Sequence, residues 1–210
     1  MRLSARPVVG LRRERKARMI NAFLTDALGK PPSGLRILDI GCGNGDMTAQ
    51  FSKYNYCVGL DVQNQVREEL RSIPHCVARS EAMPFHDASF DVVISHHVIE
   101  HVDSHDGHMS EIRRVLKPDG VAYLGTPNLS SPFMRGHVGN SMVLSYESMH
   151  PLFERHGFAV EECYTRMLSR PDRYHCETGV TRWIPAILLN SVRRWYPSQC
   201  FLLRVRSNSA

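Results

Sequence analysis

The stretch ILDIGCGNGDMT, residues 37–48, constrains the fold more than any other part of the chain. Apolar residues flank a single acid, Asp39, and the chain then passes Gly41, Gly43 and Gly45 before helix-forming residues resume. A buried strand that runs through glycines into a helix is typical of a βαβ unit, in which the turn lets a ligand approach backbone amides at the helix N-terminus. The stretch therefore predicts a parallel sheet with a ligand site in this turn.

Strand and helix patterns alternate along the rest of the chain. Short apolar runs predict strands at residues 35–40, 56–62, 75–79, 90–96, 121–127, 158–165 and 200–207. Periodic or capped segments predict helices at residues 12–28, 46–54, 64–73, 108–116, 145–156 and 183–195. This alternation predicts an α/β, Rossmann-like doubly wound fold: a mostly parallel seven-stranded sheet with an antiparallel last strand and helices on both faces.

The basic charge of the chain lies at its N-terminus. Of a net charge of +5, residues 1–18 contribute +6 from seven Lys or Arg and one acid, which leaves −1 for residues 19–210. We interpret residues 1–30 as a basic amphipathic helix that caps a main domain of residues 31–210. The basic arm suits either contact with nucleic acid or anionic lipid, or a solvated entry to the first helix.

Composition indicates a soluble, cytoplasmic protein. No apolar stretch approaches the roughly 20 residues needed to span a bilayer, and the basic start lacks the apolar run of a secretory signal. The segment RWIPAILLNSVRRWYP, residues 182–197, combines apolar and basic residues, so it permits either peripheral membrane contact or packing beneath the last strand. Six cysteines without a CxxC pair favour reduced thiols over a disulfide framework or a zinc site.

The glycine turn has the wrong pattern and charge for a dinucleotide. Asp46 stands where the last glycine of G-x-G-x-x-G falls, and together with Asp39 it would place negative charge beside a pyrophosphate. Two acids suit a cationic ligand that carries a sulfonium and an α-amino group. Asp61, at the end of the next strand, is placed to accept hydrogen bonds from both hydroxyls of a ribose. Adenosine joined to an amino acid through a positive sulfur is S-adenosylmethionine, which we predict as the cofactor.

Several segments together resemble the class I S-adenosylmethionine-dependent methyltransferases. They are LDIGCGNG (38–45), GLDV (59–62), EAMPFHDASFDVVISHHVIEHV (81–102), RRVLKPDGVAYLGTPN (113–128) and LFERHGFAVEE (152–162). Within this class, EHV followed by RVLKPDG and TPN is similar to the small-molecule branch that includes quinone, polyketide and cell-surface glycan O-methyltransferases. The resemblance implies O-methylation of a small molecule or of a sugar in a surface glycan.

The resemblance also implies a set of cofactor-binding residues. They are Asp39, Gly41, Cys42, Gly43, Gly45, Asp61, Val62, Ser80, Glu81, Ser95 and His96. Among them, Asp61 would bind the ribose and Val62 would flank the adenine. The acid that family members often place two residues before Glu81 is replaced here by Arg79, which leaves adenine to Glu81, to the backbone of residues 80–81 or to water.

Histidines crowd the segment after the strand at 90–96. A neutral hydroxyl acceptor must lose a proton, and histidine is the usual base at neutral pH. We therefore consider His97 and His101 as candidate bases, together with His137 in the loop after TPN; each is otherwise a packing or surface residue. Glu100-His101 matches a family motif whose role is commonly in positioning rather than in proton transfer.

A possible metal site and two alternative functions are considered next. The spacing of His97, His101 and His105 would suit a metal on one helical face, but Asp103-Ser104 predicts the start of a new helix, so no metal site is expected.

The basic arm favours a nucleic-acid methyltransferase, yet SHHV replaces the usual proline-rich tetrapeptide after FDVVIS. Arg79 is also consistent with a cofactor-binding partner that has lost activity. Segment 130–145 suits either a loop that covers the substrate or a passive connection, and together with segment 167–182 and the first helix it is expected to set the choice of acceptor.

Overall fold

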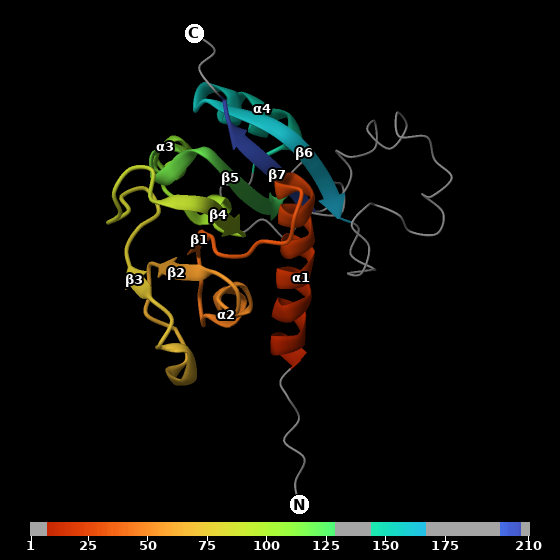
Figure 1. Cartoon of the computed structure of the whole chain (residues 1–210). Coiled ribbons are helices and arrows are strands. Elements are labelled where there is room, and N and C mark those ends of the chain that lie inside the picture. The colour runs from red at the N-terminus through yellow and green to blue at the C-terminus, as the bar shows by residue number, and fades with distance from the viewer. Residues whose placement is uncertain (1–7, 129–143, 167–197, 207–210) are drawn as a thin grey trace, which may run out of the picture.

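The computed structural model describes residues 8–128, 144–166 and 198–206 and shows one seven-stranded sheet (Figure 1). The sheet order is β3-β2-β1-β4-β5-β7-β6. The strands are β1 (Arg36–Ile40), β2 (Tyr56–Asp61), β3 (His75–Val77), β4 (Phe90–His96), β5 (Leu116–Pro127), β6 (Phe158–Arg166) and β7 (Ser198–Val205). The first five strands pair in parallel, whereas β7 runs antiparallel to both β5 and β6. The predicted fold class is therefore confirmed, including the antiparallel last strand.

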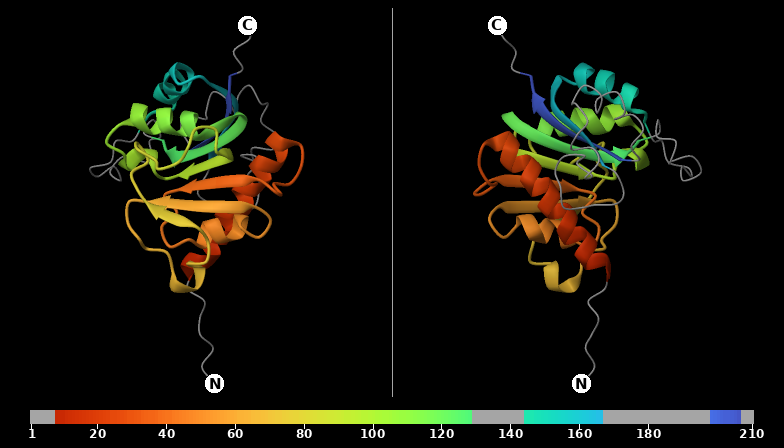
Figure 2. Two further views of the ribbon diagram at one scale, coloured as in Figure 1. Left: turned by 60° about the vertical axis from the view of Figure 1, so that its left-hand side comes forward. Right: turned by 90° about the vertical axis from the view of Figure 1, so that its right-hand side faces the viewer.

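Helices cover both faces of the sheet, as Figure 2 shows from two sides. The helices are α1 (Val8–Leu28), α2 (Asp46–Phe51), α3 (His105–Val115) and α4 (Tyr146–Arg155), with short 3₁₀ turns η1 (Glu68–Leu70) and η2 (Ile99–His101). Ile37 of β1 packs in the cluster that holds α1 and α2, while Leu38 and Ile40 pack in the cluster that holds α3 and α4. None of the described helices is long and apolar enough to cross a membrane.

The helix predicted at residues 64–73 is wrong. Only the single 3₁₀ turn η1 forms there, and none of its side chains is buried. Val66 is the one buried residue between positions 64 and 73, and Leu70 and Ile73 are only partly buried, so the segment has little packing against the core to stabilise a longer helix. The helix predicted at residues 183–195 lies outside the described residues.

Other element boundaries shift by a few residues. Helix α1 begins at Val8 instead of residue 12, and α2 ends at Phe51 instead of residue 54. Helix α3 begins at His105 because the hydroxyl of Ser104 accepts the amide of Gly107 at 3.0 Å, which confirms the start that Asp103-Ser104 predicts.

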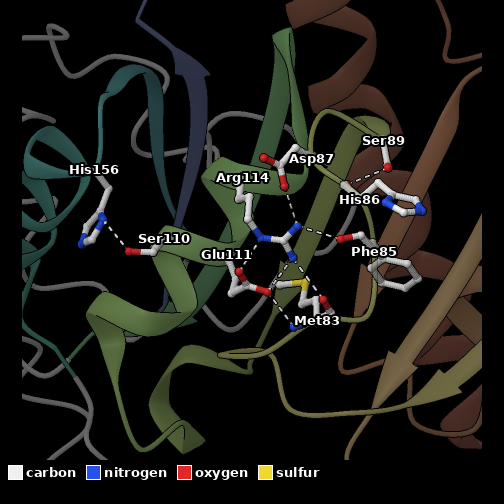
Figure 3. Close-up of polar contacts among 9 residues, drawn as sticks. All are labelled: Met83, Phe85, His86, Asp87, Ser89, Ser110, Glu111, Arg114 and His156. Atoms are coloured by element: carbon white, nitrogen blue, oxygen red, sulfur yellow. Dashed lines mark hydrogen bonds and ion pairs between the residues drawn. The ribbon is translucent and has the colours of Figure 1, made fainter.

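Arg114, in the last turn of α3, ties the loop between β3 and β4 to the helix (Figure 3). Its guanidinium donates to Glu111 at 2.6 and 2.8 Å, to Asp87 at 2.8 Å, and to the carbonyls of Phe85 and Met83 at 2.7 and 3.0 Å. Glu111 in turn accepts the amide of Met83 at 2.6 Å. The hydrogen bonds from Arg114 lower the pKa of Glu111, so the pair stays charged at neutral pH. The loop that follows residues 80–81 is thereby fixed.

We expect Arg114→Ala to lower the free energy of unfolding by about 2 kcal/mol, because it leaves a half-buried carboxylate and two loop carbonyls without their donor. Urea denaturation measures the change. Arg71→Ala, at an exposed arginine directly after η1, is the control and should change stability by no more than about 0.5 kcal/mol. Equal stabilities for the two variants would contradict the prediction.

Candidate functional site

The glycine turn after β1 needs its three glycines for backbone geometry. Gly41, Gly43 and Gly45 have φ values of 72°, 52° and 82°, in the left-handed region that favours glycine. A Cβ on Gly41 would also lie 2.4 Å from Cγ2 of Val98, so the turn packs directly against the segment after β4. The turn therefore presents bare backbone at the edge where β1 ends.

The carboxylate of Asp61 at the end of β2 is bonded to this turn. The amide of Gly43 donates to its Oδ2 at 2.9 Å, and the amide of Gln63 donates to its Oδ1 at 3.1 Å. Because β1 and β2 pair in parallel, with Ile40 opposite Leu60, the turn and Asp61 emerge at the same edge of the sheet. Asp61, the acid predicted to bind the ribose, is thus hydrogen-bonded to the glycine turn.

Asp39 lies buried beneath the turn with half of its hydrogen-bonding capacity unused. Its Oδ2 accepts the hydroxyl of Thr48 at 2.6 Å, and its Oδ1 has no hydrogen-bond partner among the described residues. Burial raises the pKa of Asp39 to about 7, because a carboxylate loses its hydration there. An unpartnered buried acceptor of this kind fits a ligand with a cationic N–H donor, as the ammonium of an amino acid provides.

A cleft of about 370 Å³ opens beside the turn, a volume in the range of small-molecule sites. Of the predicted site residues, those that line it are Gly41, Asp61, Val62, Ser80, Glu81, His97 and His101. Its other walls are Ile40, Leu60, Ala78, Arg79, Val98, Val102 and Asp103. The cleft therefore joins the ends of β1, β2 and β4 with the residues that follow β3.

Three predicted cofactor residues lie behind these walls. Cys42 is buried against Gly59, where an added Cβ would approach its Sγ to 2.9 Å, and burial raises the pKa of its thiol to about 12. Ser95 is buried and contacts Nε2 of His108 at 3.2 Å. His96 stacks on the ring of Tyr123, with ring centroids 5.9 Å apart. These side chains support the site by packing rather than by lining the cleft.

Residues 79–81 and Asp103 form a bridge over one end of the cleft. Glu81 accepts the amide of Asp103 at 3.0 Å with Oε1 and the hydroxyl of Ser80 at 3.0 Å with Oε2. Arg79 pairs with both Glu81 and Asp103. Both oxygens of Glu81 are thus engaged, and Arg79, which replaces the acid found in many family members, joins the two loops.

His97 is held in an unusual backbone conformation at the edge of the cleft. It has a φ of 59°, and its amide donates to the carbonyl of Gly125 at 2.7 Å. Its Nδ1 lies 2.8 Å from Oε1 of Glu100, whose side chain is only 3% exposed and whose Oε2 accepts the hydroxyl of Thr126 at 3.1 Å. Since a carboxylate can only accept, Nδ1 carries the proton and Nε2 keeps the basic lone pair.

The other histidines have different settings. His101 lies in η2, is exposed and lines the cleft, whereas His105 begins α3, so the three histidines at 97, 101 and 105 do not share one helix. Across residues 8–128, 144–166 and 198–206, no group of three or more His, Cys, Asp or Glu side chains is arranged to hold a metal. His137 lies outside the described residues, as do most of residues 130–145 and all of 167–182.

Sequence reasoning missed the contact between His97 and Glu100. It linked Glu100 to its neighbour His101, and the left-handed turn at His97 has no local signature in the sequence. Spacing offered one signal, because residues three apart can meet in a tight turn. Thr126, which donates a hydrogen bond to Glu100, lies 26 residues after Glu100 in the chain. The two residues become adjacent only through the pairing of β4 with β5.

Comparisons with known proteins agree with this geometry. The family model described as "Methyltransferase domain" matches residues 38–124, which hold the glycine turn, Asp61 and the His97 turn. Residues 38–124 are therefore similar to a methyltransferase domain, whose cofactor is S-adenosyl-L-methionine. The residues present fit this cofactor, because the turn offers bare amides and Asp39 offers a buried, unpartnered oxygen.

Curated relatives of this chain include the ubiquinone/menaquinone biosynthesis C-methyltransferases of Vibrio parahaemolyticus and Shewanella pealeana. The first is 34% identical over 117 residues, which is 49% of this chain and 45% of the relative. The second is 32% identical over 117 residues, covering 49% of this chain and 46% of the relative. The chain thus spans less than half the length of these two curated relatives.

Solved structures of low sequence identity share the fold. The PH0226 protein of Pyrococcus horikoshii superposes with a TM-score of 0.68 at 16% identity, covering 92% of this chain and 91% of that one. Phosphoethanolamine N-methyltransferase 2 of Haemonchus contortus, solved with S-adenosyl-L-methionine, gives 0.66 at 20% identity, covering 90% of this chain and 52% of that one. At this identity the likeness establishes the fold alone.

The raised pKa of Asp39 predicts a dependence of stability on pH. Between pH 3.8, the ordinary pKa, and about 7, the folded protein binds more protons at this residue than the unfolded chain, so the stability that Asp39 contributes at low pH is lost as pH rises. We expect Asp39→Asn to remove this loss, so that its stability relative to the wild type increases from pH 5 to pH 8.

Urea denaturation at several pH values measures this difference. Asp119→Asn, at an exposed aspartate, is the matched control and should follow the wild-type profile. Parallel profiles for Asp39→Asn and the wild type would show that Asp39 is ionised in the folded protein over the whole range, contrary to the prediction.

Proposed function

We propose that this protein transfers a methyl group from S-adenosylmethionine to an oxygen of a small molecule or of a sugar in a surface glycan, with His97 as the general base. The observation that carries the proposal is the pairing of His97 with the buried carboxylate of Glu100 at the edge of the cleft. An acceptor that is already a strong nucleophile needs no such base, whereas a neutral hydroxyl does.

The cofactor supplies a methyl group that is already activated by its sulfonium. We assign its amino-acid end to Asp39 and the turn of Gly41, Cys42, Gly43 and Gly45, and its ribose to Asp61. Val62, Ser80 and Glu81 would flank the adenine. Ser95 and His96 would support the cofactor site by packing, without lining the cleft. Holding donor and acceptor in line accounts for much of the rate in such a displacement.

In this proposal the proton moves from the acceptor to Nε2 of His97. Nδ1 of the ring keeps its hydrogen bond to Glu100, which orients the imidazole and stabilises the imidazolium that forms. Thr126 satisfies the second oxygen of Glu100, so the buried carboxylate accepts two hydrogen bonds. Glu100 and Thr126 are therefore positioning residues, and His101 serves in this scheme to line the cleft.

A second candidate is C-methylation of a phenolic or quinol ring. The names of the curated relatives favour it, since both are ubiquinone/menaquinone biosynthesis C-methyltransferases. Removal of a phenol proton by a base raises electron density on the ring carbons, so the same histidine would serve. A screen with cofactor labelled in the methyl group, using nucleotide sugars, phenols, hydroquinones and tRNA, identifies the acceptor and separates both candidates from nucleic-acid methylation. NMR of the product then shows whether the labelled methyl is on oxygen or on carbon. Product in none of these, from a protein that binds the cofactor, would favour a non-catalytic partner.

Asp61→Ala should weaken the binding of S-adenosylhomocysteine about tenfold or more, because it removes a charged acceptor from the ribose. Isothermal titration calorimetry measures the dissociation constant, and Asp119→Ala is the control at an exposed position. An unchanged dissociation constant in Asp61→Ala would contradict the ribose assignment.

His97→Gln should lower kcat by about 10² or more on the acceptor that the screen identifies, since a positioned base contributes that much. Affinity for the cofactor should stay within about twofold of the wild type, the range of a substitution outside the binding contacts. Glu100→Gln should lower kcat by a smaller factor, because it disturbs the orientation of the ring but keeps the base. Full activity in His97→Gln would exclude His97 as the base.

A further inference from the structure

Arg13 of α1 lies over the glycine turn. Its Nη1 donates to Oδ1 of Asn44. A Cβ built on Gly43 would lie 3.5 Å from Nη1 and 3.8 Å from Nη2, so the guanidinium sits against the open face of that glycine. The charge of Arg13 also acts on Asp39, where it opposes part of the rise in the pKa of that carboxyl. Three separate observations thus place this arginine at the amino-acid end of the site.

Two carboxylates around the turn, Asp46 and Asp61, already have other partners. Asp46 pairs with Arg67 at 2.7 Å, and Asp61 accepts the amides of Gly43 and Gln63. Within the described part of the chain, Arg13 forms no ion pair with any carboxylate. A guanidinium has five N–H donors. The hydrogen bond to Asn44 therefore leaves most of the donor capacity of Arg13 for a ligand.

Asn44 holds the arginine in place. Its Nδ2 donates to Asp46 at 2.8 Å, and its Oδ1 also accepts the amide of Asp46 at 3.2 Å. The side-chain amide is thus fixed by the first residue of α2, and its oxygen faces the guanidinium. An arginine oriented in this way loses less freedom when it binds an anion than a solvated one would.

We infer that Arg13 binds the α-carboxylate of the methyl donor. The amino acid of this cofactor is a zwitterion, and the site provides a charge for each end: the unpartnered Oδ1 of Asp39 for the ammonium and the guanidinium of Arg13 for the carboxylate. The inference rests on the proposed function and adds a residue to its cofactor site. It also gives part of the basic N-terminal segment a role other than contact with nucleic acid or lipid.

A binding experiment tests the assignment without any acceptor. The affinities of the full chain for S-adenosylhomocysteine and for the same thioether lacking the carboxylate are measured by isothermal titration calorimetry. The variants are Arg13→Ala, Arg13→Lys and Arg18→Ala. Arg18 is an exposed arginine of the same helix and provides the matched control. Circular dichroism melting curves report whether each variant is folded.

The wild type and Arg18→Ala should bind S-adenosylhomocysteine about tenfold or more tightly than the compound without the carboxylate. Arg13→Ala should lose this preference by binding S-adenosylhomocysteine more weakly while keeping its affinity for the second compound. Arg13→Lys should restore part of the preference, because it keeps the charge without the forked geometry.

Two results would overturn the assignment while leaving the proposed function intact. They are an unchanged preference in Arg13→Ala, and an equal loss of affinity for both compounds, which would show that Arg13 only supports the turn. Failure of the wild type to bind either compound would overturn the proposed function and the assignment together.

Discussion

The parallel pairing of β1 with β2 on one side and with β4 on the other is the constraint on which the site depends. The register places Ile40 opposite both Leu60 and Ser95. Three chain segments therefore leave the sheet at one edge: the glycine turn, Asp61 and the turn at His97. Their closeness is a property of backbone hydrogen bonding, and the side chains add chemistry to a geometry that the sheet has already set.

Charged groups lie both at the glycine turn and in the wall of the cleft. Asp39, buried and half partnered, lies beneath the turn, and Arg13 lies over it, while Arg79, Glu81 and Asp103 are paired in the wall of the cleft. A cationic methyl donor suits such a site better than a pyrophosphate does, because the acids at the turn would repel an anion. His97, the base proposed for the acceptor, also lines the cleft.

Local patterns predicted most of the fold and several of the residues that line the candidate cleft. Apolar runs located all seven strands to within a few residues, and the spacing of glycines and acids located the turn and Asp61. The helix at residues 64–73 was wrong because only Val66 of this stretch is buried, which leaves little packing against the core to stabilise a longer helix. Arg13, the Glu100–Thr126 contact and the bridge from Arg79 to Asp103 depend on residues 24 to 31 positions apart in the chain, and no local pattern predicts such contacts.

The central claim is that the turn after β1 and the acid after β2 together hold a methyl donor. A crystal structure of the chain with S-adenosylhomocysteine tests it most directly. We expect the amino-acid end of the ligand to lie over Gly41–Gly45 and both ribose hydroxyls to contact Asp61. Ligand bound elsewhere on the protein, or a cleft that admits a nicotinamide dinucleotide but not S-adenosylhomocysteine, would contradict the claim.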